Sequence, residues 1–131
     1  MPLVIEVAAG LIRDERGRYL ITQRRRGSHL EGLWEFPGGK LEAGEAPAAA
    51  LRRELAEELT ATFTVGDPVE TVEWTYPDRT VILHFFSCTL ESGAIVPTEN
   101  QAMEWVPVEK LRELDFPPAD QELIRRLGQR G

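Results

Sequence analysis

Stretches rich in apolar residues recur along the chain and are typical of β-strands, and the β-branched and small apolar residues of 3–13 predict a mostly buried strand. Residues 3–13 and 18–25 are rich in apolar side chains and are separated by a polar turn that ends in glycine, which predicts two strands paired as a hairpin. Residues 62–74 and 79–90 repeat this arrangement around Tyr76-Pro-Asp-Arg79, where proline followed by aspartate indicates a turn. The pattern therefore predicts two hairpins that lie far apart in the sequence.

Between the hairpins, apolar residues recur with the period of an amphipathic helix. Leu51, Leu55 and Leu59 recur within residues 48–59, a run of strong helix formers that follows Pro47, a residue suited to a first turn. Further elements are predicted as an extended piece at residues 34–36, a short strand at 103–106, a short helix at 108–114 and a terminal helix at 121–127. Elements in this order predict an α+β fold, a mixed sheet with helices on its faces.

Length and composition fit one soluble domain. The 131 residues, 42% hydrophobic and 28% charged, are enough to bury a core, and no repeat or linker divides residues 1–131. No apolar run approaches the roughly 18 residues of a membrane span, and the features of a signal peptide are missing, so we expect a cytoplasmic protein that binds no membrane. The single cysteine, Cys88, excludes a disulfide framework, and a net charge of −7 argues against binding a nucleic-acid polymer.

The helix at residues 48–59 carries an acidic edge. Glu54, Glu57 and Glu58 stand at i, i+3 and i+4 and therefore share one face. Such a face is often merely solvated, but the turn Gly38-Gly39 lies upstream of it and brings bare backbone close to a neighbouring group. Carboxylates and a backbone carbonyl are the oxygen ligands that Mg²⁺ or Mn²⁺ takes. The pattern favours a divalent-metal site over a solvated face.

A dense basic run, Arg24-Arg25-Arg26, ends the second predicted strand. Composition leaves two interpretations open, because such a run is either a solvated strand end or a set of ligands for phosphate or a base. His29 follows in the next loop, where a lone histidine is usually an exposed polar residue. These positions become informative only when they are considered together with longer motifs.

The spacing of the acidic helix resembles a family signature. Gly39, Glu45 and the run Arg53-Glu-Leu-Ala-Glu-Glu58 fit the Nudix hydrolase signature G-x5-E-x7-R-E-U-x-E-E-x-G-U, in which U is aliphatic. Four further segments are similar to the MutT-type 8-oxo-dGTP diphosphatases of that family: Trp34-Glu-Phe-Pro-Gly-Gly-Lys40, Tyr76-Pro-Asp-Arg79, Glu99-x-Gln-x-x-Glu-Trp105 and Phe116-Pro-Pro-Ala119. The resemblance covers nearly the whole chain and implies a Nudix-type α/β/α sandwich with a mixed β-sheet between helices.

Membership in that family implies hydrolysis of a nucleoside triphosphate to a monophosphate and pyrophosphate, with Mg²⁺ as cofactor and Mn²⁺ as a possible substitute. By the resemblance, the metal ligands are the Gly38 carbonyl and the carboxylates of Glu54, Glu57, Glu58 and Glu99. Glu54 is either a ligand or the general base, and which glutamate is the base stays open. Arg53 and Glu45 pair with each other and pin the loop to the helix.

The resemblance also implies which residues meet the nucleotide. These are Arg24, His29, Phe36, Gly38, Lys40, Tyr76, Asp78, Arg79 and Asp120. The implied substrate is 8-oxo-dGTP, in nucleotide-pool sanitation and DNA repair. The alternatives are a cytidine triphosphate, normal or modified, and a nucleotide-binding Nudix module without catalysis. Whether the chain is a monomer or a homodimer stays open.

Three positions depart from the pattern: Asp120, Thr60 and Ala61. The most similar MutT-type pattern has asparagine where Asp120 follows Phe-Pro-Pro-Ala. An ionised aspartate accepts the N7–H that distinguishes 8-oxoguanine but repels the adjacent O6 unless it is protonated, and it also suits the amino group of cytosine. The signature expects glycine and an aliphatic residue at Thr60 and Ala61, which puts the geometry of the helix end in question.

Overall fold

The predicted elements are present in the computed structural model, which describes residues 3–28 and 30–129. The strands are β1 (Leu3–Ile12), β2 (Tyr19–Gln23), β3 (Trp34–Glu35), β4 (Gly38–Lys40), β5 (Thr62–Tyr76), β6 (Arg79–Ser92) and β7 (Met103–Val106). The helices are α1 (Pro47–Leu59), α2 (Val108–Leu111) and α3 (Pro118–Gln129). No helix in the described part of the chain combines the length and apolar character needed to cross a membrane.

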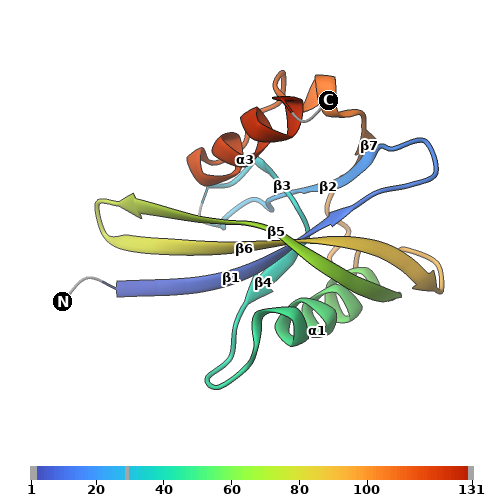
Figure 1. The fold of residues 1–131 in the computed structure, drawn as a ribbon, viewed down its shortest axis with the longest axis horizontal. Helices are drawn as coiled ribbons and strands as arrows, with labels where there is room; N and C mark the ends of the chain where they lie inside the picture. Colours follow the sequence, from blue (N-terminus) through green and yellow to red (C-terminus); the bar gives the residue numbers. More distant parts are fainter. Residues whose placement is uncertain (1–2, 29, 130–131) are drawn as a thin grey trace.

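The strands form two sheets between the helices. The larger sheet has the order β4-β1-β6-β5, and the smaller has the order β3-β2-β7. Strands β1 and β6 run parallel, with Ile5 opposite Val81, whereas β1 and β4 as well as β5 and β6 run antiparallel. Helix α1 covers one side of the larger sheet and α3 the other (Figure 1). The predicted mixed sheet in an α/β/α sandwich is confirmed.

The prediction of an N-terminal hairpin is wrong. Among the described residues, β1 and β2 share the isolated bridge between Arg13 and Tyr19, while β2 pairs with β3 and β7. The reason lies in β1, because residues 8–12 are all buried, as expected of a central strand with both faces covered. Both edges of β1 are occupied by β4 and β6, so β2 joins the other sheet.

The second hairpin and the helices agree more closely with expectation. Strands β5 and β6 pair from Tyr76 opposite Arg79 back to Thr62 opposite Ser92. Helix α2 ends at Leu111, three residues before the predicted end, and α3 begins at Pro118, three residues before the predicted start. Proline is tolerated in a first helical turn, and the earlier start places Asp120 in that turn of α3.

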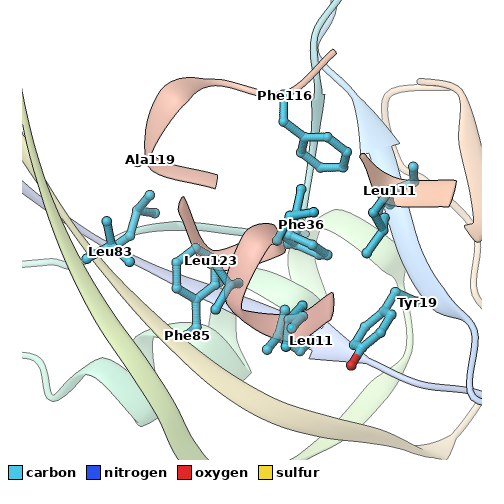
Figure 2. Packing of buried hydrophobic residues seen from close by; sticks show 14 of the residues in the cluster. Leu11, Tyr19, Phe36, Leu83, Phe85, Leu111, Phe116, Ala119 and Leu123 are labelled. Atoms are coloured by element: carbon cyan, nitrogen blue, oxygen red, sulfur yellow. The ribbon is translucent and has the colours of Figure 1, made fainter. Parts of the chain in front are cut away.

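Each side of the larger sheet has its own apolar core. Under α1 the core includes Leu51, Leu55 and Leu59, all fully buried, together with Cys88. Burial raises the pKa of the Cys88 thiol to about 12, which agrees with its prediction as a small core residue. Under α3 the core is built around aromatic rings, and Figure 2 shows this cluster. The two cores fix α1 and α3 on opposite sides of the strands that line the site.

Candidate active site

The acidic edge of α1 faces a cavity of about 360 Å³. The helix is fixed by buried leucines on its other side, which leaves Glu54, Glu57 and Glu58 along the cavity wall. Gly38 in β4 and Glu99 in the loop after β6 line the same cavity. The residues predicted as metal ligands are therefore brought to one hollow by three separate segments of the chain.

The glycine turn is packed too closely for side chains. A Cβ atom at Gly38 would overlap the backbone carbonyl of Ala8, and one at Gly39 would overlap the carboxylate of Glu54. Glycine at position 39 therefore allows the Glu54 carboxylate to lie directly against β4. This contact explains why a glycine at this position accompanies a glutamate fifteen residues later on the helix.

Two glycine variants distinguish an effect on protein stability from an effect on catalysis. Gly39→Ala is expected to leave the thermal unfolding temperature near that of the wild type and to lower kcat about tenfold or more, because the flexible Glu54 side chain moves aside. Gly38→Ala meets rigid backbone at Ala8 instead and is expected to destabilise the protein. Unfolding and hydrolysis are measured on both variants. Equal losses of stability in the two would contradict this distinction.

Arg53 organises the acidic edge. Its Nε and Nη2 atoms donate to the two carboxylate oxygens of Glu45, both at 2.9 Å, and Nη2 also donates to the Lys40 carbonyl at 3.2 Å. Its Nη1 atom donates to Glu54 at 3.0 Å and lies 3.5 Å from Glu57. Hydrogen bonds from Arg53 lower the pKa of Glu45 to about 2. Arg53 thus ties the loop to the helix and orients Glu54.

The surroundings of Glu58 favour the protonated form of its carboxylate. Burial, followed by the charges of Glu35 and Glu54, raises its pKa to about 7. The Gly38 N–H donates to Glu58 Oε2 at 3.3 Å and opposes part of this shift. Carboxylates crowded in this way are a donor set that suits a divalent cation, whose charge relieves their mutual repulsion.

The carboxylates are each held by a partner on the protein. Glu99 pairs with Arg25 at 2.7 Å, while Glu54 and Glu57 are held by Arg53. Within residues 3–28 and 30–129, no three potential ligands already converge as a metal-binding group. The residues that could hold a cation, by position and donor type, are the predicted set of Gly38, Glu54, Glu57, Glu58 and Glu99.

A second cavity, of about 340 Å³, adjoins the first. Apolar side chains of β1 and β6 line one wall, including Ile5, Val7, Val81 and Leu83. These residues were predicted as strand positions and not as site residues, although their alternation along each strand places them on one face. Seven residues predicted to meet a nucleotide line this cavity: Arg24, Phe36, Gly38, Lys40, Tyr76, Arg79 and Asp120. The predicted nucleotide residues are therefore largely brought together.

Three predicted nucleotide residues need comment. Asp78 is not among the residues that line the cavity, and it pairs with Arg79, which does line it, at 3.0 Å. Phe36 is only 3% exposed and belongs to the core, where its ring stacks on Phe116 at 5.4 Å between centroids (Figure 2). It supports the cavity wall more than it offers open surface. His29 lies outside the described residues.

Glu35 joins the two cavities and was not predicted as a site residue. It lines both, and its carboxylate accepts a hydrogen bond from Arg24 Nη1 at 2.9 Å. Burial raises its pKa, and the neighbouring Arg24 opposes that shift. The sequence held one signal, since Glu35 is an acidic residue between two aromatic residues in the segment Trp34–Lys40.

Asp120 is a buried polar group that lines the second cavity. The residue is 6% exposed, and burial together with the charge of Glu35 raises its pKa to about 8, against the opposing charge of Arg24. At neutral pH this carboxyl is therefore mostly protonated. A neutral carboxylic acid has one O–H donor and one carbonyl acceptor, the same pair of functions as a carboxamide.

The chain is similar to known proteins in sequence and in fold. A model of the NUDIX domain matches residues 8–126. The 8-oxo-dGTP diphosphatase of Escherichia coli (strain K12) is 37% identical over 94% of this chain and 95% of its own length, and the CTP pyrophosphohydrolase of the same strain is 37% identical over 92% and 89%. The solution structure of the DNA mismatch repair protein MutT from methicillin-resistant Staphylococcus aureus 252 has a TM-score of 0.81 at 35% identity, covering 100% of both chains. The chain belongs to the Nudix family.

Proposed function

We propose that the chain hydrolyses 8-oxo-dGTP to 8-oxo-dGMP and pyrophosphate with Mg²⁺, and so removes an oxidised precursor from the nucleotide pool. Support comes from two adjoining cavities with complementary chemistry, one lined by carboxylates and one partly apolar with the buried Asp120. Arg24, Glu35 and Gly38 line both cavities. A nucleotide with its base in the second cavity extends its phosphates toward the acidic edge of α1.

The choice of 8-oxoguanine as the base rests on the raised pKa of the buried Asp120. In its neutral form it donates to O6 and accepts from the N7–H of 8-oxoguanine, which removes the repulsion expected of a carboxylate. Guanine has no proton at N7, so its lone pair would face the carbonyl oxygen of Asp120. A site built for a substrate N–H rejects the analogue that lacks it, because a buried polar group is left without a partner.

The acidic edge supplies the chemistry in this proposal. Gly38, Glu54, Glu57, Glu58 and Glu99 would hold Mg²⁺, which would neutralise the charge that builds on the phosphate oxygens. A carboxylate of the cluster takes a proton from the attacking water, whose oxygen bonds to a phosphorus of the α–β anhydride. The bridging P–O bond of that anhydride breaks, which separates pyrophosphate from the nucleoside monophosphate. Arg53 acts as a positioning residue, since it touches Glu54 and Glu57 rather than the cavity.

A cytidine triphosphate is the second candidate substrate. The relative named CTP pyrophosphohydrolase is as similar to this chain as the 8-oxo-dGTP diphosphatase of the same strain. An ionised Asp120 would accept a hydrogen bond from the amino group of cytosine. The protonation state of Asp120 therefore separates the two substrates, and burial of the carboxyl favours the first.

The test is pyrophosphate release from 8-oxo-dGTP, dGTP, dCTP and CTP, each at sub-micromolar concentration with Mg²⁺ or with a chelator. We expect the lowest KM for 8-oxo-dGTP, with monophosphate and pyrophosphate as products and no turnover under chelation. A lower KM for CTP or dCTP would support the second candidate. Tight nucleotide binding without turnover at any metal concentration would indicate a binding module and would overturn the proposed activity.

A further inference from the structure

The loop between β6 and β7 lies along the C-terminal end of α1. The last carbonyls of a helix have no partner within the helix and must find one elsewhere. Here the Val96 N–H donates to the Leu59 carbonyl at 2.9 Å, and the Thr98 N–H donates to the Glu58 carbonyl at 2.9 Å. The Thr98 hydroxyl reaches the same Glu58 carbonyl at 3.2 Å. The loop therefore caps the helix at Glu58, whose partly buried carboxylate lines the cavity.

Thr60 adds a side-chain link to this loop. It ends the helix in the left-handed conformation, with φ of 54° and ψ of 29°, although threonine adopts this region poorly. Its hydroxyl oxygen lies 2.7 Å from the Val96 carbonyl oxygen and 2.7 Å from that of Leu59, so one proton is shared between two acceptors. A glycine would adopt this backbone conformation more easily but could not make the bond to Val96.

The same loop carries a predicted metal ligand. Glu99 follows Thr98 directly, and both residues line the first cavity, at the acidic edge of α1, together with Glu58. Beyond Thr98, the Glu99 N–H donates to the Gln101 side chain at 3.2 Å, and the Glu99 carboxylate pairs with Arg25. The contacts that hold residues 96–98 on the end of α1 therefore act together with those of Gln101 and Arg25 to set the position of Glu99 relative to Glu58.

We propose that Thr60 is a positioning residue whose hydroxyl holds the loop of residues 96–99 on the end of α1, so that Glu99 stands over the same cavity as Glu58. This role rests on the proposed metal-dependent function. It gives a physical reason for threonine at a position where the family signature has glycine. The hydroxyl bond between Thr60 and Val96 offsets the cost of the left-handed backbone and fixes the distance between two segments that line the site.

Three substitutions at this position separate the hydroxyl from the backbone conformation. Thr60→Val removes the hydroxyl and keeps the branched side chain, Thr60→Ser keeps the hydroxyl, and Thr60→Gly removes the hydroxyl and relaxes the backbone. Thr75→Val is the matched control. The Thr75 hydroxyl contacts that of Thr80 at 3.2 Å near the turn between β5 and β6, whereas Thr60 lies before the other end of β5. The measurements are amide exchange at Val96 and Thr98, Mn²⁺ affinity of the nucleotide-free protein, and kcat and KM.

We expect Thr60→Val and Thr60→Gly to speed amide exchange at both loop positions, to weaken Mn²⁺ binding and to lower kcat, each about fivefold, with KM unchanged. Thr60→Ser should retain wild-type values, and Thr60→Gly should unfold at the wild-type temperature or above it. Unchanged exchange in Thr60→Val, or faster exchange with unchanged Mn²⁺ affinity and kcat, would overturn the role of Thr60. A wild-type chain that neither binds Mn²⁺ nor hydrolyses nucleotides would instead contradict the proposed function.

Discussion

Glu58→Gln is expected to lower kcat for nucleotide hydrolysis more than about 100-fold, because loss of an outer partner of a metal ligand already costs up to about that much. Glu58 lines the cavity at the acidic edge, and burial together with the charges of Glu35 and Glu54 raises the pKa of its carboxylate. Glutamine keeps the shape of the side chain but removes the charge that would hold a cation. The measurement is kcat with saturating Mg²⁺.

The same substitution has the opposite effect on folding. Because the pKa of Glu58 is raised from 4.5 to about 7, the folded protein keeps a proton between these values that the unfolded chain releases. Stability from this group is therefore present below pH 4.5 and is lost as the pH rises through 7. Without metal at pH 8, Glu58→Gln should be more stable than the wild type, a difference that shrinks toward pH 4.5.

The control for this prediction is Glu104→Gln, an exposed position on β7 outside both cavities. It should change neither kcat nor stability appreciably. A Glu58→Gln variant that retains more than about a tenth of wild-type turnover would exclude a direct role in metal binding. A variant that loses both activity and stability at pH 8 would show that Glu58 serves the fold and not the chemistry.

Base discrimination is expected to depend on pH through Asp120. The ratio of kcat/KM for 8-oxo-dGTP to that for dGTP should be highest below pH 7 and should fall as the pH rises through about 8, where Asp120 ionises and repels O6. Using a ratio at each pH cancels the ionisation of the catalytic groups, which affects both substrates. The expected ratio below pH 7 is at least about 100.

Two variants test whether Asp120 causes this dependence. Asp120→Asn keeps one donor and one acceptor without a titrating proton, so its ratio should stay high and flat from pH 6 to pH 9. Asp120→Ala should lower the ratio toward one with little loss of basal turnover. If Asp120→Asn lost discrimination while the wild-type ratio did not change with pH, recognition by a neutral Asp120 would be wrong.

The sequence predicted where the strands lie better than it predicted which strands pair with each other. Apolar composition correctly indicated the strands that became β1 and β2, but it carried no information on pairing, and β1 pairs in parallel with β6 more than seventy residues away. A continuous buried run such as residues 8–12 was the available sign of a central strand. The hairpin of β5 and β6 was easier, because its turn residues identify the connection directly.

Site residues whose positions follow from sequence spacing were predictable. Residues whose role depends on burial in the folded protein were less so. The signature spacing placed Glu54, Glu57 and Glu58 on one edge, and the structure brings that edge to the cavity. Glu35 was missed because its importance comes from lying between two cavities, which is a tertiary property. The neutral state of Asp120 likewise depends on burial that no local pattern reports. Phe36 was predicted to meet the nucleotide, but its ring is mostly enclosed by the core and exposes little surface to the cavity.

A competition assay tests the central claim most directly. Equimolar 8-oxo-dGTP, dGTP, dCTP and CTP are mixed with the protein and Mg²⁺ at pH 7, and the monophosphates formed early in the reaction are quantified together. Their proportions give the ratios of kcat/KM without separate kinetics. The two-cavity arrangement with a neutral Asp120 predicts that 8-oxo-dGMP exceeds every other product at least about 100-fold. Preferential formation of CMP or dCMP, or no preference among the four, would contradict it.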